Sequence, residues 1–91
     1  MDFLDHADVT GRLRGLVIML DDKITVEQSR DVDASIDASE FAVALEALAR
    51  YLAESATALP NDLRVDFERL ADKMEIRDAV METLSRCPVE E

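Results

Sequence analysis

Apolar side chains recur at steps of three and four residues along most of the chain. The two clearest runs are Phe41, Leu45, Leu48 and Leu52, and then Leu63, Phe67, Leu70 and Met74. This spacing places each run on one face of an α-helix. Glycine and proline contribute only two residues each, so little in the chain interrupts helices. We therefore predict an all-α fold, a small bundle of four to five helices that forms a single domain over residues 1–91.

Start and stop signals divide the chain into these helices. The first is expected to begin near Asp8 and to end at residues 21–23. Thr25 and Gln28 have the form of a capping box, which opens a second, solvent-facing helix that runs to Ile36. Ser39 is expected to cap the third helix, which we place at the centre of the core. Pro60 then marks the restart of a fourth helix.

The carboxyl-terminal part of the chain is expected to be less ordered. A short last helix carries Ile76, Val80 and Leu84 at helical spacing. Residues 87–91 then read as a frayed acidic tail, so the structured core is predicted to cover about residues 8–86. Cys87 lies in this tail and is interpreted as an incidental thiol.

Net charge limits the class of partner. The chain has 21 acidic and 10 basic side chains, a formal net charge of −11. Such a charge repels nucleic acid and anionic lipid and favours a cationic partner. The acids concentrate in residues 21–40, which hold seven acidic and two basic side chains. This block predicts either a docking surface for a basic protein or a solvated helix face that serves solubility.

Several features predict a cytoplasmic protein. No apolar stretch is longer than the five residues of Leu16–Leu20, far fewer than the roughly 20 residues that a bilayer span needs. The amino terminus is acidic, whereas a secretory signal begins with basic residues. Cys87 is the only cysteine, which excludes a disulfide within the chain and agrees with a reducing compartment. We expect no contact with a membrane.

The acids of the second helix resemble part of a calcium-binding EF loop. Asp31, Asp33, Ser35 and Asp37 match its first, third, fifth and seventh positions. The match fails where the loop needs glycine and a bidentate glutamate, since Ile36 and Ala42 occupy those two positions. The segment is better interpreted as continuous helix, so we expect no metal site.

The segment from Ser35 to Phe41 also looks like the prosthetic-group attachment region of acyl carrier proteins. In that interpretation Ser35 carries phosphopantetheine at the start of a long helix. Ala34 stands where carrier proteins have aspartate, and the glycine that precedes it in those proteins is missing. An acyl-carrier-like protein modified at Ser35 therefore stays as an alternative.

Nothing in the sequence has the pattern of a catalytic site. His6 is the only histidine, and no serine or cysteine nucleophile is arranged around it in a known motif. Asp62 and Asp66 are close enough in sequence for acid–base work, but a bundle of this size has no evident cleft to shift their ionisation. We therefore expect no enzyme activity and no cofactor. Tyr51 lies beside an apolar stripe and is a candidate contact residue.

The stretch from Ile36 to Ile76 resembles the MafI-type immunity proteins, which are related in role to the immunity partners of contact-dependent growth inhibition toxins. Three segments carry the resemblance: Ile36-Asp37-Ala38-Ser39-Glu40-Phe41, Ala44-Leu45-Glu46-Ala47-Leu48, and Leu70-Ala71-Asp72-Lys73-Met74-Glu75-Ile76. Leu52 and Leu59-Pro60 also match. The chain departs from the family at Ser39, where glycine is usual, and at Phe41, where tyrosine is more common.

The resemblance implies a bacterial immunity protein that binds the carboxyl-terminal domain of its cognate toxin and neutralises it by occlusion. Such toxin domains are often nucleases, whose basic grooves an acidic helix face can occupy in place of a phosphate backbone. Charge alone then selects the predicted contact residues: Glu27, Asp31, Asp33, Asp37 and Glu40, with Tyr51 and Glu54 further along. An acidic regulator of a basic nucleic-acid-binding protein is a second alternative, and a homo-oligomer stays open.

Overall fold

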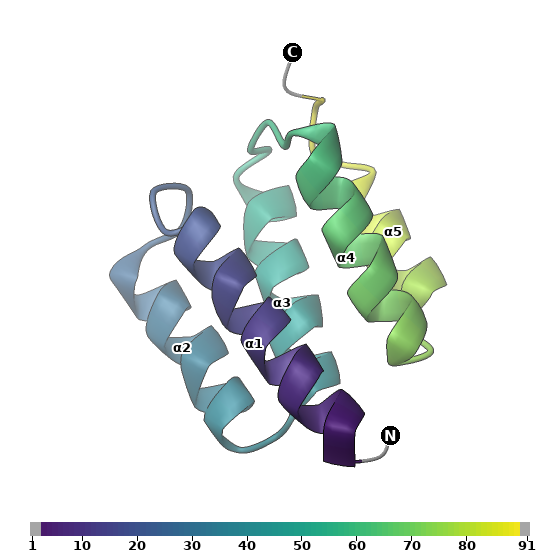
Figure 1. The fold of residues 1–91 in the computed structure, drawn as a ribbon. Helices are drawn as coiled ribbons and strands as arrows, with labels where there is room; N and C mark the ends of the chain where they lie inside the picture. Colours follow the sequence, from purple (N-terminus) through teal and green to yellow (C-terminus); the bar gives the residue numbers. More distant parts are fainter. Residues whose placement is uncertain (1–2, 90–91) are drawn as a thin grey trace.

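Five helices follow one another in the computed structural model, which describes residues 3–89, with side chains from residue 6 onward (Figure 1). They are α1 (Phe3–Met19), α2 (Val26–Asp37), α3 (Phe41–Glu54), α4 (Asn61–Lys73) and α5 (Arg77–Leu84). The prediction of a small all-α bundle is confirmed. The helix bounds after Thr25 lie close to the predicted ones.

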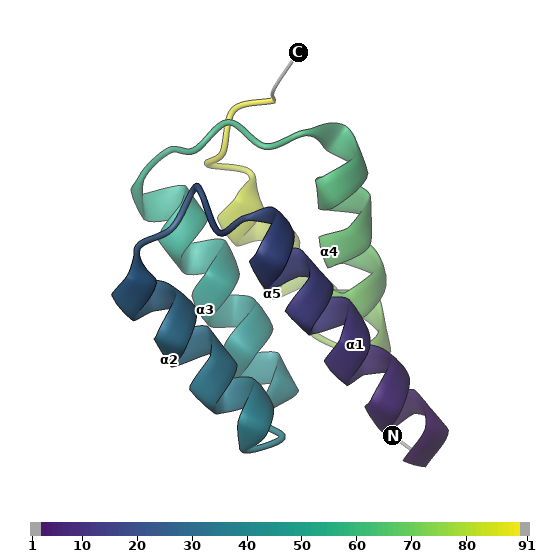
Figure 2. The same cartoon turned by 60° about the vertical axis from the view of Figure 1, so that its left-hand side comes forward.

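Helix α3 is the centre of the bundle, as its alanine-rich sequence predicts. It contacts all four other helices, whereas α1 packs against α2, α3 and α4 only. Helices α4 and α5 form a hairpin that covers the side of α3 away from α2 (Figures 1 and 2). Helix α1 therefore lies between α2 and α4, with one face turned to solvent.

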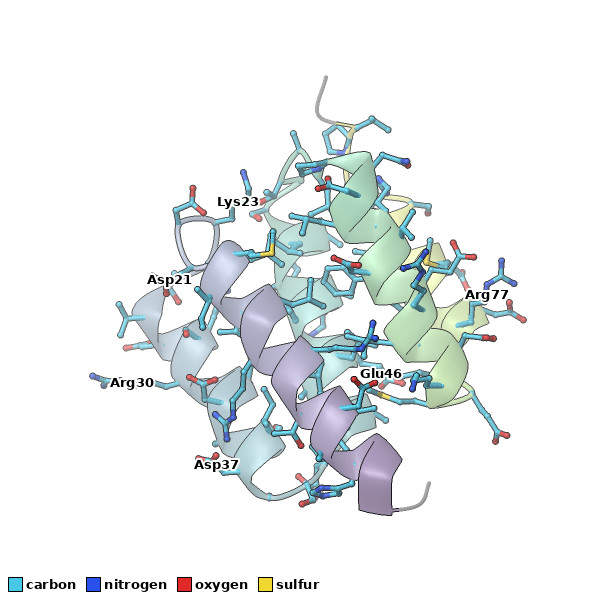
Figure 3. All side chains as sticks on the ribbon, in the orientation of Figure 1. Asp21, Lys23, Arg30, Asp37, Glu46 and Arg77 are labelled. Atoms are coloured by element: carbon cyan, nitrogen blue, oxygen red, sulfur yellow. The ribbon has the colours of Figure 1, made fainter. Side chains whose placement is uncertain are left out.

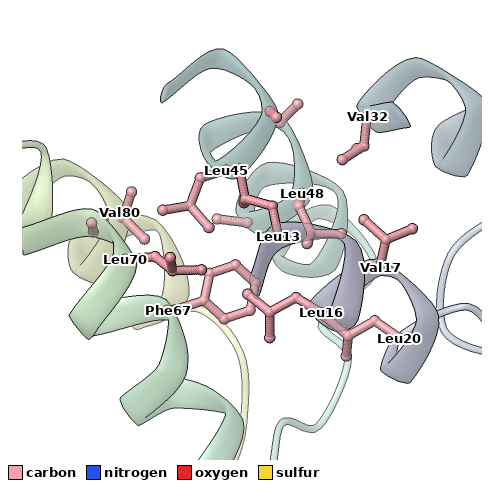
Figure 4. Close-up of a cluster of buried hydrophobic side chains, with 14 of the residues drawn as sticks. Leu13, Leu16, Val17, Leu20, Val32, Leu45, Leu48, Phe67, Leu70 and Val80 are labelled. Carbon is pink, nitrogen blue, oxygen red and sulfur yellow. The ribbon is translucent and has the colours of Figure 1, made fainter. Parts of the chain in front are cut away.

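The core contains the apolar stripes that the spacing predicts. Phe67 is completely buried, and it lies among leucines and valines from α1, α3 and α4 (Figure 4). Ala44, Ala47 and Ala49 are also buried, which allows the neighbouring helices to approach α3 closely. Helix α2 contributes less to this core, because it buries only Val32 and Ile36.

The capping box at the start of α2 is present as predicted. The backbone N–H of Gln28 donates to Oγ1 of Thr25 at 3.0 Å, and the backbone N–H of Thr25 donates to Oε1 of Gln28 at 3.0 Å. Each side chain thus satisfies a backbone donor that the first helical turn leaves free.

Helix α1 begins at Phe3, so the predicted start near Asp8 is wrong. The additional residues at the start of α1 are held by contacts with residues far away in the sequence, which no local pattern predicts. The ring of His6 packs edge-on against Phe41 with centroids 4.8 Å apart, and its Nε2 lies 3.1 Å from Oγ of Ser39. These contacts join the start of α1 to the turn between α2 and α3.

Ser39 does not cap α3, which corrects a second prediction. Glu40 is the N-cap residue, and no side chain caps this helix. Ser39 instead has a φ of 60° and ends α2, with its N–H bonded to the carbonyl of Ile36 and that of Glu40 bonded to the carbonyl of Ser35. This is the Schellman arrangement, in which a left-handed residue closes a helix.

The predicted frayed tail is wrong for residues 87–89. Cys87 is buried, and the N–H of Leu59 donates to the carbonyl of Pro88 at 2.8 Å. The guanidinium of Arg64 also donates to the carbonyls of Leu84, Cys87 and Pro88. The half-buried Arg64 and three carbonyl acceptors therefore hold this segment. Residues 90 and 91 lie outside the described part.

Candidate partner-binding surface

The predicted contact residues lie on α2, on α3 and in the turn between them, but they do not form one patch. Asp33 and Asp37 lie on the side of α2 that faces α1, whereas Asp31 reaches toward α3. Glu40 lines a separate hollow together with Lys73 and Glu75. The predicted surface is thus divided into parts with different neighbours.

The first part is a groove between α1 and α2, which we call the α1–α2 groove. It is lined by Arg14, Val17, Ile18, Asp21, Ser29 and Asp33. Ile18 is 75% exposed, although it belongs to the run of five apolar residues from Leu16 to Leu20. In Figure 3, Asp21 and Asp37 lie near opposite ends of α2, whereas Arg30 extends outward from α2, away from α1. The groove therefore combines an exposed aliphatic side chain with carboxylates.

Arg14 changes the charge expected for this region. Its guanidinium donates to the carboxylate of Asp37 at 2.5 Å, which pairs one of the predicted contact acids within the chain. The charge count for residues 21–40 could not include this pair, because the basic partner comes from α1. In the part of the chain that is described, Asp21 and Asp33 form no ion pair, so their charges are available to a partner.

The second part of the predicted surface is held by Tyr51. Its phenol donates a hydrogen bond to the carboxylate of Asp31, and Arg50 lies 5.4 Å from the centroid of its ring. Arg50 also pairs with Glu54, with Nε and Oε1 3.9 Å apart. We call Asp31, Arg50, Tyr51 and Glu54 the Tyr51 cluster. Both acids of this cluster, Asp31 and Glu54, therefore have partners. Glu27 lies one turn before Asp31, is exposed and has no partner among the described residues.

Two exposed apolar residues of α1 are further candidates for partner contact, and the charge distribution gave no reason to select them. Ile18 and Met19 are 75% and 55% exposed. A signal for them was present, because five consecutive apolar residues from Leu16 to Leu20 cover more than a full helical turn. A stretch of that length cannot be buried on one face, so some of its members must face solvent.

The residues that resemble a calcium-binding loop and a phosphopantetheine attachment site lie in helical positions that fit neither motif. Asp31, Asp33, Ser35 and Asp37 all belong to the continuous helix α2, not to a loop. Ser35 is in the last turn of α2, although a carrier protein would place it at a helix start. Among residues 6–89, no group of three or more acidic, histidine or cysteine side chains is placed to hold a metal ion.

Comparison of the chain with protein-family models, with curated proteins and with solved structures gave no match. The resemblance to immunity proteins thus stays a prediction from the quoted residues. Within residues 3–89, every helix is too short or too polar to cross a bilayer.

Proposed function

We propose that the protein is an immunity protein, which binds a cationic toxin domain and neutralises it by covering its working surface. The observation that supports this most is the α1–α2 groove, where 75% exposed Ile18 lies with Asp21 and Asp33. Met19, 55% exposed, extends the apolar surface beside Ile18, and an apolar patch rimmed by charged groups is typical of protein-binding sites. The net charge of −11 adds long-range attraction for a basic partner.

A nuclease is the class of toxin that fits this surface best. Nucleases bind a polyanion, so their substrate grooves carry lysine and arginine. The carboxylates of Asp21 and Asp33 would take the place of phosphates there, while Ile18 contributes apolar contact. In this mechanism the immunity protein performs no reaction and inhibits by occlusion alone.

The neighbours of each acid decide which ones contribute to binding. Asp37 is held by Arg14 and Asp31 by Tyr51, so a partner would have to compete with bonds already formed. Asp21 and Asp33 have no such partner in the described residues. We therefore assign more of the binding to Asp21 and Asp33 than to Asp31 and Asp37. Reversing Asp37 to lysine would also place two cations together and loosen α1 from α2.

Immunity genes are expected directly after the gene of their toxin, so the test uses the carboxyl-terminal domain of whatever protein is encoded immediately upstream of this chain. That domain is co-expressed with the tagged protein, bacterial growth is recorded, and affinity is measured by calorimetry at low and high salt. We expect rescue of growth and a tight complex that weakens as salt rises. Neither binding nor rescue would reject the immunity function.

Two double variants with the same change in net charge distinguish the effect of the α1–α2 groove on affinity from the effect of total charge. Asp21→Lys with Asp33→Lys should weaken binding by roughly 10- to 100-fold and slow association. Asp72→Lys with Glu82→Lys changes the net charge equally, but at exposed positions on α4 and α5. The second pair should lose much less affinity. An equal loss would mean that overall charge acts and that the α1–α2 groove is not the contact surface.

A further inference from the structure

The solvent-facing side of α1 has no side chains at two positions in successive turns, because both are glycines. Gly11 and Gly15 lie four residues apart on this side, and a Cβ added to either would meet nothing within 4 Å beyond the adjoining residues and backbone of its own helix. Glycine is among the poorest residues for a helix interior, so helix stability does not account for the pair. Ile18 and Met19, 75% and 55% exposed, continue the same face in the next turn.

Hollows lie on both sides of this face. The α1–α2 groove is on one side and contains Asp21 and Asp33. The other side has what we call the α1–α4 hollow, lined by Arg12, Gly15, Leu16, Met19, Asp66 and Leu70. Figures 1 and 2 show α1 between α2 and α4, so the two hollows run along its two flanks. Each flank therefore has at least one carboxylate that forms no described ion pair, beside an arginine that is paired within the chain.

We propose that this face of α1 is the docking site for a cationic amphipathic helix of the partner protein. The two glycines leave room for the helix to approach α1 closely, and Ile18 and Met19 supply the apolar contact. Lysines or arginines along both edges of the bound helix would then reach Asp33 on one flank and Asp66 on the other. The proposal rests on the cationic partner of the proposed function and adds the shape of the element that binds.

A second copy of this chain fits the face poorly. Two copies would bring together two net charges of −11, with acidic flanks facing acidic flanks. The basic residues nearest the face do not offset this, because both are paired within their own chain. Arg12 lies 3.0 Å from a carboxylate oxygen of Asp8, and Arg14 lies 2.5 Å from one of Asp37. Charge complementarity therefore favours a basic helix.

The surface can be tested without the toxin. The isotope-labelled protein is titrated with a synthetic helical peptide that has leucine and alanine on one face and lysines along both edges, and amide chemical shifts are followed. We expect the largest changes at Gly11, Gly15, Ile18 and Met19. Absence of binding, or changes centred on another face, would overturn the proposal.

Substitutions at the glycines decide whether close approach matters. Gly15→Gln fills the open space with a better helix former and no charge, and should weaken peptide binding by about tenfold or more. Gly11→Gln repeats the test at the other position. Ala79→Gln is the control, since this exposed residue lies on α5, which does not contact α1. Equal affinity of the wild type and both glycine variants would overturn the proposal.

Two further outcomes distinguish this proposal from the proposed function. If the peptide docks on α1 but the upstream toxin domain neither binds nor is neutralised, the surface stands and the immunity function fails. If the toxin domain binds with equal affinity to the wild type and both glycine variants, the immunity function stands and this use of α1 fails. A dimer of the chain that Gly15→Gln dissociates would show that a second copy is the occupant.

Discussion

The phenol of Tyr51 donates a hydrogen bond to the carboxylate of Asp31 and so joins α3 to α2 across the surface of the bundle. The carboxylate stabilises the neutral phenol, and its negative charge opposes ionisation. Together with partial burial, this hydrogen bond raises the pKa of Tyr51 above its ordinary value of 10.0. Tyr51 is the only tyrosine of the chain, so its ionisation can be followed directly by absorbance.

Asp31→Asn should lower the pKa of Tyr51 toward the ordinary value. The amide oxygen can still accept the hydrogen bond, but the negative charge is lost. An alkaline absorbance titration measures the shift. Glu54→Gln is the control, because Glu54 pairs with Arg50 and does not bond the phenol. A titration curve unchanged by Asp31→Asn would show that the bond does not form in solution.

The same pair predicts the alkaline limit of stability. The folded pKa of Tyr51 lies above the unfolded one, so its contribution is complete below about pH 10 and is lost as pH rises through the folded pKa. The free energy of unfolding of the wild type should therefore fall more in this range than that of Tyr51→Phe. Parallel curves for the two proteins, measured by denaturant unfolding, would contradict the linkage.

Asp8 links α1 to α4 and should give the fold an acid-sensitive component. Arg12 donates to its carboxylate at 3.0 Å and Lys73 donates at 3.2 Å, and these bonds lower the pKa of Asp8 below its ordinary value of 3.8. A lowered folded pKa gives stability above pH 3.8 that is lost as pH falls through the folded pKa. Asp8→Asn should thus be less stable than the wild type at neutral pH and equal to it in strong acid. A stability difference that persists in strong acid would reject this assignment.

Arg64 should control the reactivity of Cys87. Burial raises the pKa of the thiol, and the carbonyls of Cys87 and Pro88 are held by the guanidinium. Arg64→Met removes these bonds, so we expect a loss of about 2 kcal/mol in the free energy of unfolding. The loosened segment should expose Cys87 and speed its reaction with a thiol reagent, although the Arg64 charge that lowers the thiol pKa is lost as well. Arg69→Met is the control, because Arg69 is exposed and forms no ion pair within the described residues. Equal thiol reaction rates in both variants would contradict this role.

The helices could be predicted from sequence because their causes are local. The spacing from Phe41 to Leu52 and the capping box at Thr25 each act within a few residues, and both are confirmed. What could not be predicted depends on partners distant in sequence. The pairing of Arg14 with Asp37 separates residues by 23 positions, and that of Arg64 with Cys87 does the same. No pattern on either element alone reveals such contacts.

For the candidate surface, too, local features could be predicted from the sequence and contacts between distant residues could not. Charge counts correctly selected α2 as an exposed acidic helix, but they could not tell that Tyr51 would bond Asp31 while Asp33 would have no ion pair among the described residues. The backbone conformation of Ser39 was also not predicted. Its φ of 60° is a conformation that favours glycine, and no local pattern in the sequence indicates it at a serine.

Three helices end in left-handed residues that are not glycine, which predicts an easy route to higher stability. Ser39, Ala56 and Glu75 have φ values of 60°, 49° and 61°. At Ala56 the Schellman bonds are complete, because Ala56 N–H donates to Ala53 and Thr57 N–H donates to Leu52. Ala56→Gly removes the steric strain of the Cβ and keeps both bonds, so it should stabilise the fold by about 0.5–1 kcal/mol.

Ala38→Gly is the matched control for Ala56→Gly, because Ala38 also follows a helix but has an ordinary φ of −82°. There glycine relieves no strain and only makes the unfolded chain more flexible, so we expect a loss of a few tenths of a kcal/mol. Denaturant midpoints of the two variants should move in opposite directions from that of the wild type. Movement in the same direction would show that the left-handed conformation at Ala56 costs nothing in solution.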